Sequence, residues 1–222
     1  MPIQGGMRRI LSTALLLTLT IVASAAASGS DQEQVKLTPA GQAAARSAIL
    51  RLADLGPVSG FTGGPVTPGE SSTPDCATYH PKQSDLVKNG DAESSFSQKN
   101  ILIESEATVL ASAAMVQTDW QRTVRPELAG CLRALFARSL GASGKVVSVS
   151  DLSFPQVATY AHGYRAVLQV VKAGTTSRVV SDFILFGRGR TEITLNVTSP
   201  PSTSTAAVEA QLAGTLAARI VA

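Results

Sequence analysis

The sequence is short of the residue types that define several classes of protein. Among its 222 residues there are two cysteines, two histidines and one tryptophan, and aromatic residues make up 5%. Two cysteines are too few for a disulfide-dense scaffold or a multi-cysteine zinc module. Glycine and proline occur at ordinary levels without a period, which excludes collagen-like and low-complexity chains. Since 44% of the residues are hydrophobic, the chain has enough apolar side chains to form a core rather than remain disordered.

The first 27 residues have the three parts of a secretory signal peptide. Arg8 and Arg9 form a basic segment, residues 10–22 are apolar, and small residues follow up to Ala27. We expect residues 1–27 to be removed and residues 28–222 to form a single exported α+β domain. The alternative is an uncleaved anchor helix, but the apolar run is shorter than the about 20 residues that span a bilayer. No cysteine lies near the end of that run to serve as a lipoprotein anchor site, so we expect no stable membrane anchor after cleavage.

The charge balance does not indicate a nucleic-acid partner. The chain has 19 basic and 16 acidic residues, a net charge of +3, and Arg8 and Arg9 leave with the signal segment. No dense block of lysine and arginine remains, so binding dominated by phosphate contacts is not expected. The expected partner is instead a small ligand or a protein of the cell envelope, and the sequence implies no cofactor.

The predicted export gives the two cysteines a role. In an oxidising compartment, Cys76 and Cys131 most simply form one disulfide. Cys76 lies in residues 56–90, a long loop rich in Gly, Pro, Ser and Thr that this disulfide would tie down. The alternatives are a mobile lid over an active site, and a nucleophilic Cys131 paired with His80 or His162, which no local motif supports.

Periodicity predicts the order of helices and strands. Thr38 and Pro39 are typical of a helix start, and an apolar stripe continues from there to Leu55, before Gly56. Alternation predicts strands at 93–98, 101–109, 145–149, 158–171, 177–187 and 191–198. Further helical stripes lie at 115–124, 128–136 and 208–220, with a break at Pro126. This order predicts an α+β domain with a central antiparallel β-sheet of about five to six strands packed by helices.

The last three strands are expected to form a meander with two unlike faces. The first turn is expected to be a two-residue turn at Ala173-Gly174 or a four-residue loop at residues 173–176. With either of them and a three-residue loop at residues 188–190, alternation places Ile193, Leu195 and Val197 on the same core face as Tyr164. The opposite face then mixes charged and apolar side chains, which predicts that something covers or binds it. The candidate binding residues on that face are Arg165, Arg178, Asp182, Ile184, Phe186, Glu192 and Asn196.

Catalytic motifs are scarce. No G-x-S-x-G, H-E-x-x-H, C-x-x-C or P-loop pattern occurs, and the two histidines lack the spacing of metal ligands. Glu104 and Glu106 lie two apart on a predicted strand and so face the same way, as a hydrolytic carboxyl pair would. Trp120 lies on an apolar helical stripe and is expected in the core. We therefore expect a non-catalytic binding module. The alternatives are a small secreted hydrolase, using Glu104 and Glu106 or a serine with His162, and a structural or assembly role.

Three segments resemble known exported domains. Residues 164–201, followed by an amphipathic C-terminal helix, look like the end of PsbP-like domains. The segments AILRLADLGPVSGFTGGP and VLASAAMVQTDWQR resemble exported actinobacterial lipoproteins and PknH-type kinase sensor domains, with Phe61 near the place of a usual tryptophan. The lipobox cysteine and the second cysteine pair of those relatives are missing. The resemblance implies an antiparallel sheet packed by helices and used for binding, and it carries over no catalytic residue.

Overall fold

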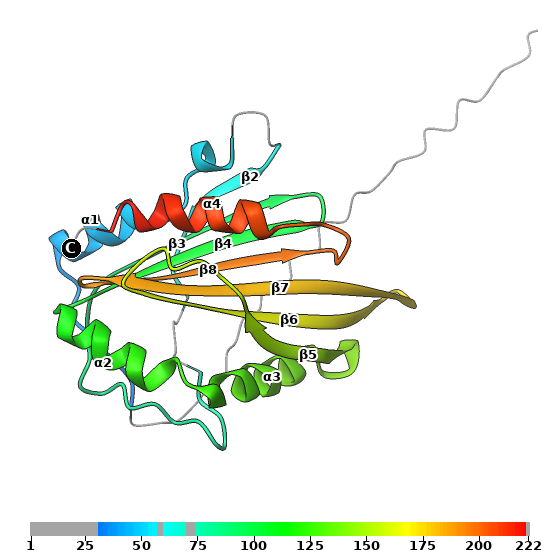
Figure 1. Cartoon of the computed structure of the whole chain (residues 1–222), viewed down its shortest axis with the longest axis horizontal. Coiled ribbons are helices and arrows are strands. Elements are labelled where there is room, and N and C mark those ends of the chain that lie inside the picture. Colours follow the sequence, from blue (N-terminus) through cyan, green and yellow to red (C-terminus); the bar gives the residue numbers. More distant parts are fainter. Residues whose placement is uncertain (1–30, 57–59, 70–73, 221–222) are drawn as a thin grey trace, which may run out of the picture.

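An eight-stranded β-sheet forms the centre of the molecule in the computed structural model (Figure 1). The structure describes residues 31–56, 60–69 and 74–220, so the predicted signal segment 1–27 lies outside the described residues. The strand order is β1 (Gln34–Val35), β3 (Val87–Gln98), β4 (Ile101–Leu110), β8 (Thr191–Ser199), β7 (Thr175–Arg188), β6 (Tyr160–Lys172) and β5 (Gly144–Leu152). Strand β2 (Thr62–Val66) also pairs with β3. The α+β class is confirmed, but the sheet is larger than five to six strands and is mixed, because β1 pairs with β3 in parallel.

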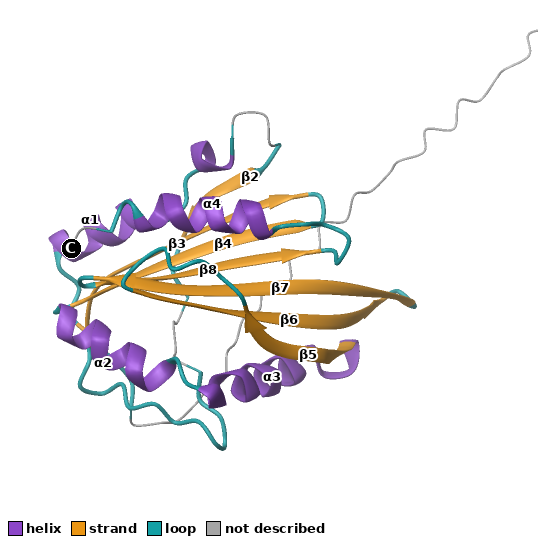
Figure 2. Cartoon of the chain, in the orientation of Figure 1, coloured by secondary structure: helices purple, strands orange, loops and turns teal. Residues whose placement is uncertain are grey.

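Within the described part of the chain, four α-helices cover the two faces of this sheet (Figure 2). Helices α1 (Pro39–Ala48) and α4 (Ala206–Ala217) pack on one face, and α2 (Ala113–Thr123) and α3 (Pro126–Leu140) lie on the other. Short 3-10 turns follow α1 at Leu52–Leu55 and α3 at Gly141–Ser143. The predicted break at Pro126 is confirmed, because Arg125 before it is extended and cannot continue α2.

Helix α1 begins as predicted and ends earlier than predicted. The Thr38 hydroxyl caps it by accepting a hydrogen bond from the Gly41 amide, and Pro39 opens its first turn. The helix ends at Ala48, whereas a helix up to Leu55 was expected: Ile49 and Arg51 are extended, and Leu52–Leu55 form the separate 3-10 turn. Leu50 enters the core fully buried, and its amide donates a 2.8 Å hydrogen bond to the hydroxyl of Ser105 on β4. That bond replaces the helical one, so the chain leaves the helix without burying an unpaired amide.

Glycine allows α1 to lie directly against β3. A Cβ atom on Gly90 would be 2.1 Å from the carbonyl oxygen of Gly41, which is closer than any side chain can be placed. The reverse also holds, since a Cβ on Gly41 would be 2.2 Å from the carbonyl oxygen of Asn89. The two backbones therefore meet without intervening side chains, which sets the position of α1 on the sheet.

The stretch 56–90 contains more regular structure than expected. Its described part includes the strand β2 and the start of β3, so the prediction of a continuous loop is wrong there. The tie at Cys76 is confirmed: it forms a disulfide with Cys131 on α3, and their Cα atoms are 5.5 Å apart. Cys76 and Tyr79 also exchange backbone hydrogen bonds of 3.0 and 2.9 Å, which form a tight turn above α3.

One predicted turn in the meander is correct and the other is one residue too long. Ala173 and Gly174 have positive φ angles of 47° and 75° and form the predicted two-residue turn. The next turn contains only residues 189 and 190, since Arg188 pairs with Thr191. Because side chains alternate along a strand, this difference of one residue moves the apolar side chains of β8 to the opposite face. The expected face shared by Tyr164 and Ile193 is therefore wrong.

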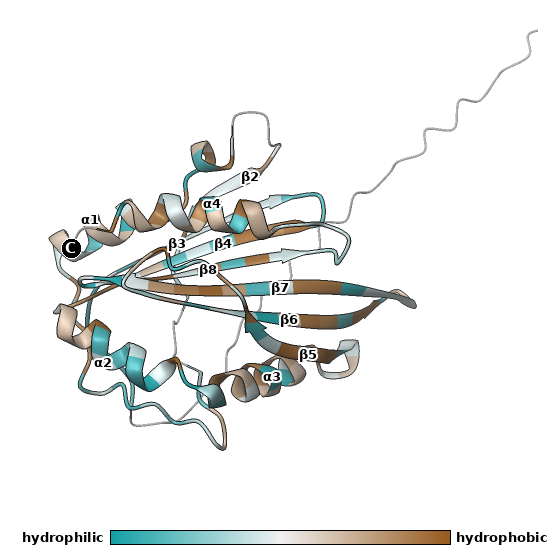
Figure 3. Cartoon of the chain, in the orientation of Figure 1, coloured by the Kyte–Doolittle hydropathy of each residue, from teal (hydrophilic) through white to brown (hydrophobic). Residues whose placement is uncertain are grey.

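Each face of the sheet has its own apolar core. On the α1 and α4 side, Phe96, Ile184, Phe186 and Leu195 pack among helix residues and are at most 1% exposed. On the α3 side, Tyr164 and the apolar side chains of β6 pack against the helix and the disulfide. Figure 3 shows apolar residues concentrated on β6, β7 and α4, and polar residues along α2. Among the described residues, no helix is long and apolar enough to cross a membrane.

The prediction of a buried apolar stripe along α4 is partly wrong. Leu212, Leu216 and Ile220 are buried as expected, but Val208 is 46% exposed. Its neighbour Glu209 is completely buried instead. The helix therefore places a carboxyl group, rather than an apolar side chain, at the start of its contact with the sheet.

We predict that the disulfide contributes a large part of the stability. Replacing Cys76 and Cys131 together by serine should lower the free energy of unfolding by about 4 kcal/mol in the loop-entropy model, because the bond closes a long loop in the unfolded chain. Urea unfolding followed by fluorescence measures this loss. A reductant should lower the urea midpoint of the wild type to that of the double serine variant. The midpoint of the variant itself should not change. Equal midpoints for wild type and variant without reductant would contradict the prediction.

Candidate functional site

The seven predicted binding residues do not form one surface. Ile184 and Phe186 are completely buried in the core beneath α1 and α4, and Phe186, like Glu192, also lines the cavity described below. Glu192 and Asn196 lie on the other face of the sheet, because β8 is turned over relative to the prediction. Arg178 is exposed near the tip of the hairpin formed by β6 and β7. The prediction of a single semi-apolar face is thus wrong.

Two of the seven form an ion pair on the α4 side. Arg165 and Asp182 are cross-strand partners and are joined by two hydrogen bonds of 2.7 and 2.6 Å. Asp182 is fully buried, and Glu209 of α4 lies close to it. Burial, and then the nearby Asp182, raise the pKa of Glu209 to about 7. This group joins α4 to the sheet rather than lining an open site.

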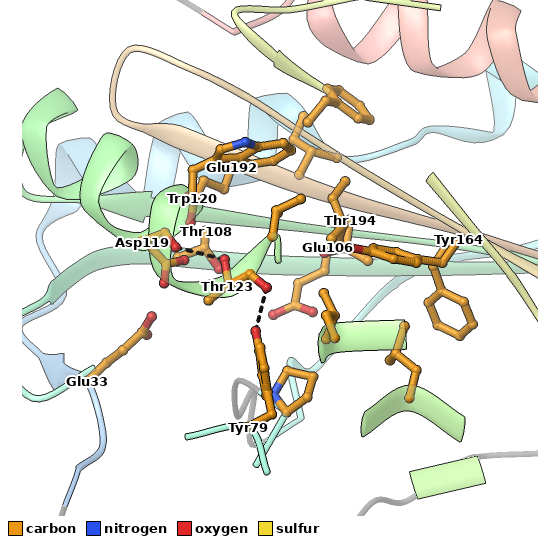
Figure 4. Close-up of a pocket in the computed structure, with 18 residues that line it drawn as sticks. Glu33, Tyr79, Glu106, Thr108, Asp119, Trp120, Thr123, Tyr164, Glu192 and Thr194 are labelled. Carbon is orange, nitrogen blue, oxygen red and sulfur yellow. Dashed lines mark hydrogen bonds between the residues drawn. The ribbon is translucent and has the colours of Figure 1, made fainter. Parts of the chain in front are cut away.

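A cavity of about 260 Å³ lies on the opposite side, between the sheet and α2 and α3 (Figure 4). We call this space the acidic cavity. Its lining comes from β4, β6, β7 and β8 on the sheet, from α2 and α3, from the loop before β3, and from Glu33. The strands present the side chains that alternate away from the α1 and α4 core, which is why Glu106, Thr108, Glu192 and Thr194 point here.

The lining has a polar end and an apolar wall. The polar end carries the carboxyl groups of Glu33, Glu106, Asp119 and Glu192. The apolar wall is contributed by α3 and by β7, whose members are Leu128, Leu132, Phe183 and Leu185. Most ligand sites combine an apolar lining with a few convergent polar groups in this way.

Asp119 and Glu192 form the most perturbed pair in the acidic cavity. Burial, and then the nearby Asp119, raise the pKa of Glu192 well above its usual value. Burial also raises the pKa of Asp119, although this carboxyl accepts a 2.8 Å hydrogen bond from the Gln83 amide. Two neighbouring carboxyl groups cannot both ionise at low cost, so the protonated form of Glu192 is favoured, with a hydrogen bond to Asp119.

A second buried charge group borders the polar end. The ammonium group of Lys88 lies 3.4 Å from Glu33 and 3.5 Å from Asp91, and the lysine is 4% exposed. Burial raises the pKa of Glu33 even though Lys88 opposes the effect. The lysine thus holds Glu33 at the rim while its own charge is already shared between two carboxylates.

Tyr79 closes the acidic cavity from the side of the disulfide. It is 1% exposed, and its hydroxyl donates a 2.5 Å hydrogen bond to the carbonyl oxygen of Thr123 on α2. The guanidinium of Arg125 lies over its ring, 5.7 Å from the centroid. Burial is the main cause that raises the pKa of Tyr79, so the hydroxyl remains a donor. The loop held by Cys76 therefore supplies a fixed wall.

The residues considered for catalysis are only partly brought together. Glu104 and Glu106 do share a face of β4, but only Glu106 lines the acidic cavity. His162 lies on β6, with Nε2 3.2 Å from a carboxylate oxygen of Asp151, and His80 contacts Asp75 on the surface. Among the described residues, no group of three or more His, Cys, Asp or Glu side chains is arranged to hold a metal ion.

Trp120 has a different place from the one predicted. It is only partly buried, lines the acidic cavity, and stacks on Tyr160 with ring centroids 5.3 Å apart. Sequence reasoning also missed Asp119, Tyr79 and Glu33 as members of one site. The available signal was the polar alternation of Glu106 and Thr108, which is unusual on a sheet that has helices on both faces.

Comparison with known proteins adds little to this geometry. No protein-family model matches the chain, and no curated protein matches its sequence. The protein of unknown function PA94 from Pseudomonas aeruginosa is a solved structure with 14% sequence identity and a TM-score of 0.24. The match covers 57% of this chain and 85% of that one. A similarity this low supports no conclusion about fold or function.

We predict that Glu192 makes the protein less stable as the pH rises. The unfolded chain releases this proton near the ordinary value of 4.5, whereas the folded protein retains it to a much higher pH. Its contribution to stability is therefore complete below pH 4.5 and is lost as the pH rises through the folded pKa, by at most about 1.4 kcal/mol per pH unit.

Glu192→Gln should remove this loss, because glutamine keeps a donor toward Asp119 without a proton to release. Thermal unfolding between pH 5 and 8 is the measurement, and the variant should melt about 2–4 °C above the wild type at pH 8 for each kcal/mol regained. Glu127→Gln, at an exposed position on α3, is the matched control and should follow the wild type. Parallel curves for wild type and Glu192→Gln would contradict the assignment.

Proposed function

We propose that this protein is an exported binding protein that takes a small, partly apolar ligand into the acidic cavity. The observation that carries the proposal is the cavity itself, about 260 Å³ between a sheet and two helices. The space is partly open to solvent and is lined by the sheet, two helices and a loop, and concave sites of this kind are where small ligands usually bind.

The form of the lining also supports binding. An apolar wall offers a surface for a hydrocarbon body, and a small number of polar groups at one end can fix its orientation. The disulfide and the Tyr79 hydrogen bond hold in place the loop that forms one wall of the cavity. A ligand that enters therefore does not have to order this loop, which lowers the free-energy cost of binding.

The proposed location is the cell envelope or the medium. It is supported by the signal-like segment 1–27 and by the disulfide, a bond typical of oxidising compartments. A PsbP-like or sensor-like relationship remains a prediction from the sequence resemblance, and a role in assembly with another envelope protein remains the alternative without a small ligand.

Filling the acidic cavity should abolish ligand binding. We expect Thr194→Phe, at the centre of the sheet wall, to raise the Kd of any cavity ligand at least tenfold by occupying its space. Ligands would be found by a thermal-shift screen of metabolites and lipids, in which a ligand at 100 times its Kd stabilises the protein by about 2.7 kcal/mol.

Thr198→Phe is the matched control for this variant. Thr198 lies on the same strand and face as Thr194, four residues along, and does not line the cavity. Its binding should equal that of the wild type. If Thr194→Phe binds the ligand as well as the wild type does, the site lies elsewhere.

A second candidate, carboxyl-based hydrolysis, is favoured by one observation. A protonated Glu192 and the carboxylate of Asp119 share the acidic cavity with Glu106, and glycoside hydrolases use such an acid together with a carboxylate. This candidate predicts release of product from chromogenic glycosides by the wild type and at least a hundredfold loss of kcat in Glu192→Gln. Absence of turnover across a broad glycoside panel would contradict it and leave binding as the function.

A further inference from the structure

The polar end of the acidic cavity is unbalanced in charge. Four of its lining side chains are carboxyl groups, and none of the described lining residues is lysine, arginine or histidine. The nearby cations already face other groups: Lys88 bridges Glu33 and Asp91 and also attracts Glu106, Arg122 makes two hydrogen bonds of 2.6 and 3.0 Å to Asp85, and Arg125 lies over the ring of Tyr79. Even with Glu192 protonated, carboxylates outnumber cations around this end, so a ligand that enters it meets negative potential.

Hydrogen-bond acceptors are also in excess there. Next to Asp119, the side-chain oxygen of Gln83 has no hydrogen-bond partner among the described residues, although this side chain is 4% exposed. Gln83 does not itself line the cavity and reaches it only through the hydrogen bond that it donates to Asp119. The carboxyl oxygens that do line this end are hydrogen-bond acceptors, so it favours a group that donates hydrogen bonds.

Aromatic rings surround the same space. Trp120 lies on α2 and Tyr164 on the sheet side, and both rings line the cavity (Figure 4). The third ring, Tyr79 from the loop, already has the guanidinium of Arg125 over it. Burial raises the pKa of Tyr164 to about 12, so its ring remains a neutral phenol. Ring faces attract organic cations, and the attraction increases when the pair is removed from water.

The apolar wall of the cavity determines the chemistry of the rest of the ligand. Leu128, Leu132 and Leu185 offer only hydrocarbon, and a group with its own charge would lose hydration against them without compensation. A cavity of about 150 Å³ holds a benzene molecule, so the acidic cavity, at about 260 Å³, has room for an aromatic or branched aliphatic body with a short polar head.

We infer that the ligand of the acidic cavity is a small organic amine, with its ammonium group among the carboxyl groups of Glu33, Glu106, Asp119 and Glu192 and its apolar body against α3 and β7. This inference rests on the proposed function and names the ligand class of the same site. An anionic ligand is excluded from the polar end by like-charge repulsion, and a neutral one gains no charge compensation there.

Three probes that share one body test the ligand class. 2-Phenylethylamine, 2-phenylethanol and phenylacetate carry a cationic, a neutral and an anionic head on the same aromatic group. Isothermal titration calorimetry at pH 7 with the mature protein should give a Kd for the amine at least tenfold lower than for the alcohol, and no detectable binding of phenylacetate.

The matched variants are Glu106→Gln and Glu104→Gln. Both residues lie on the same face of β4, but only Glu106 lines the acidic cavity. Glu106→Gln should weaken the amine at least fivefold while leaving the alcohol unchanged, which also shows that the cavity is intact. Glu104→Gln should bind all three probes as the wild type does.

The outcomes separate this inference from the proposed function. If the alcohol or phenylacetate binds as tightly as the amine, or if Glu106→Gln keeps the preference for the amine, the ligand class is wrong. If the amine does not bind but a ligand from the screen binds and is lost in Thr194→Phe, the inference fails and the binding function stands. If no probe and no screened ligand binds, both fail.

Discussion

The pairing of β4 with β8 is the interaction on which the other features depend. Ala107 lies opposite Ile193 and Ser105 opposite Leu195, and these side chains pack beneath α1 and α4. Their neighbours alternate to the other face, where Glu106 lies opposite Thr194 and supplies the sheet wall of the acidic cavity. Because one register serves both faces, core and cavity cannot be changed independently: a shift of one residue would bury the carboxyl groups beneath α1 and expose the apolar side chains.

The second requirement is a wall opposite the sheet, and the disulfide supplies it. Cys76 is bonded to α3, and the turn that it forms with Tyr79 brings that ring against α2. Carboxyl groups enclosed in this way lose hydration, which is the main cause that raises the pKa of Glu33, Asp119 and Glu192. The fold tolerates them because Lys88, Gln83 and a shared proton each compensate part of the negative charge.

Local chemistry predicted helix caps, breaks and turns well, but it predicted less well on which face of the sheet the side chains of a strand lie. The Thr38 cap, the Pro126 break and the Ala173-Gly174 turn depend on neighbouring residues only, and all three are confirmed. The end of α1 at Ala48 was missed because it depends on the hydroxyl of Ser105, more than fifty residues away in the sequence. The face of β8 was missed because a turn one residue shorter than expected inverts every later side chain.

Periodicity, turn residues and composition are properties of short segments, and they were enough to predict the α+β class, most of the strands in the last third, and the disulfide as the simplest use of two cysteines. That Glu106, Asp119, Glu192 and Tyr79 meet around one space became visible only in the folded molecule. Those residues come from two strands, a helix and a loop, and no local pattern records which of their faces are opposed. Their meeting depends on strand register and helix packing, which are set by the burial of the whole core.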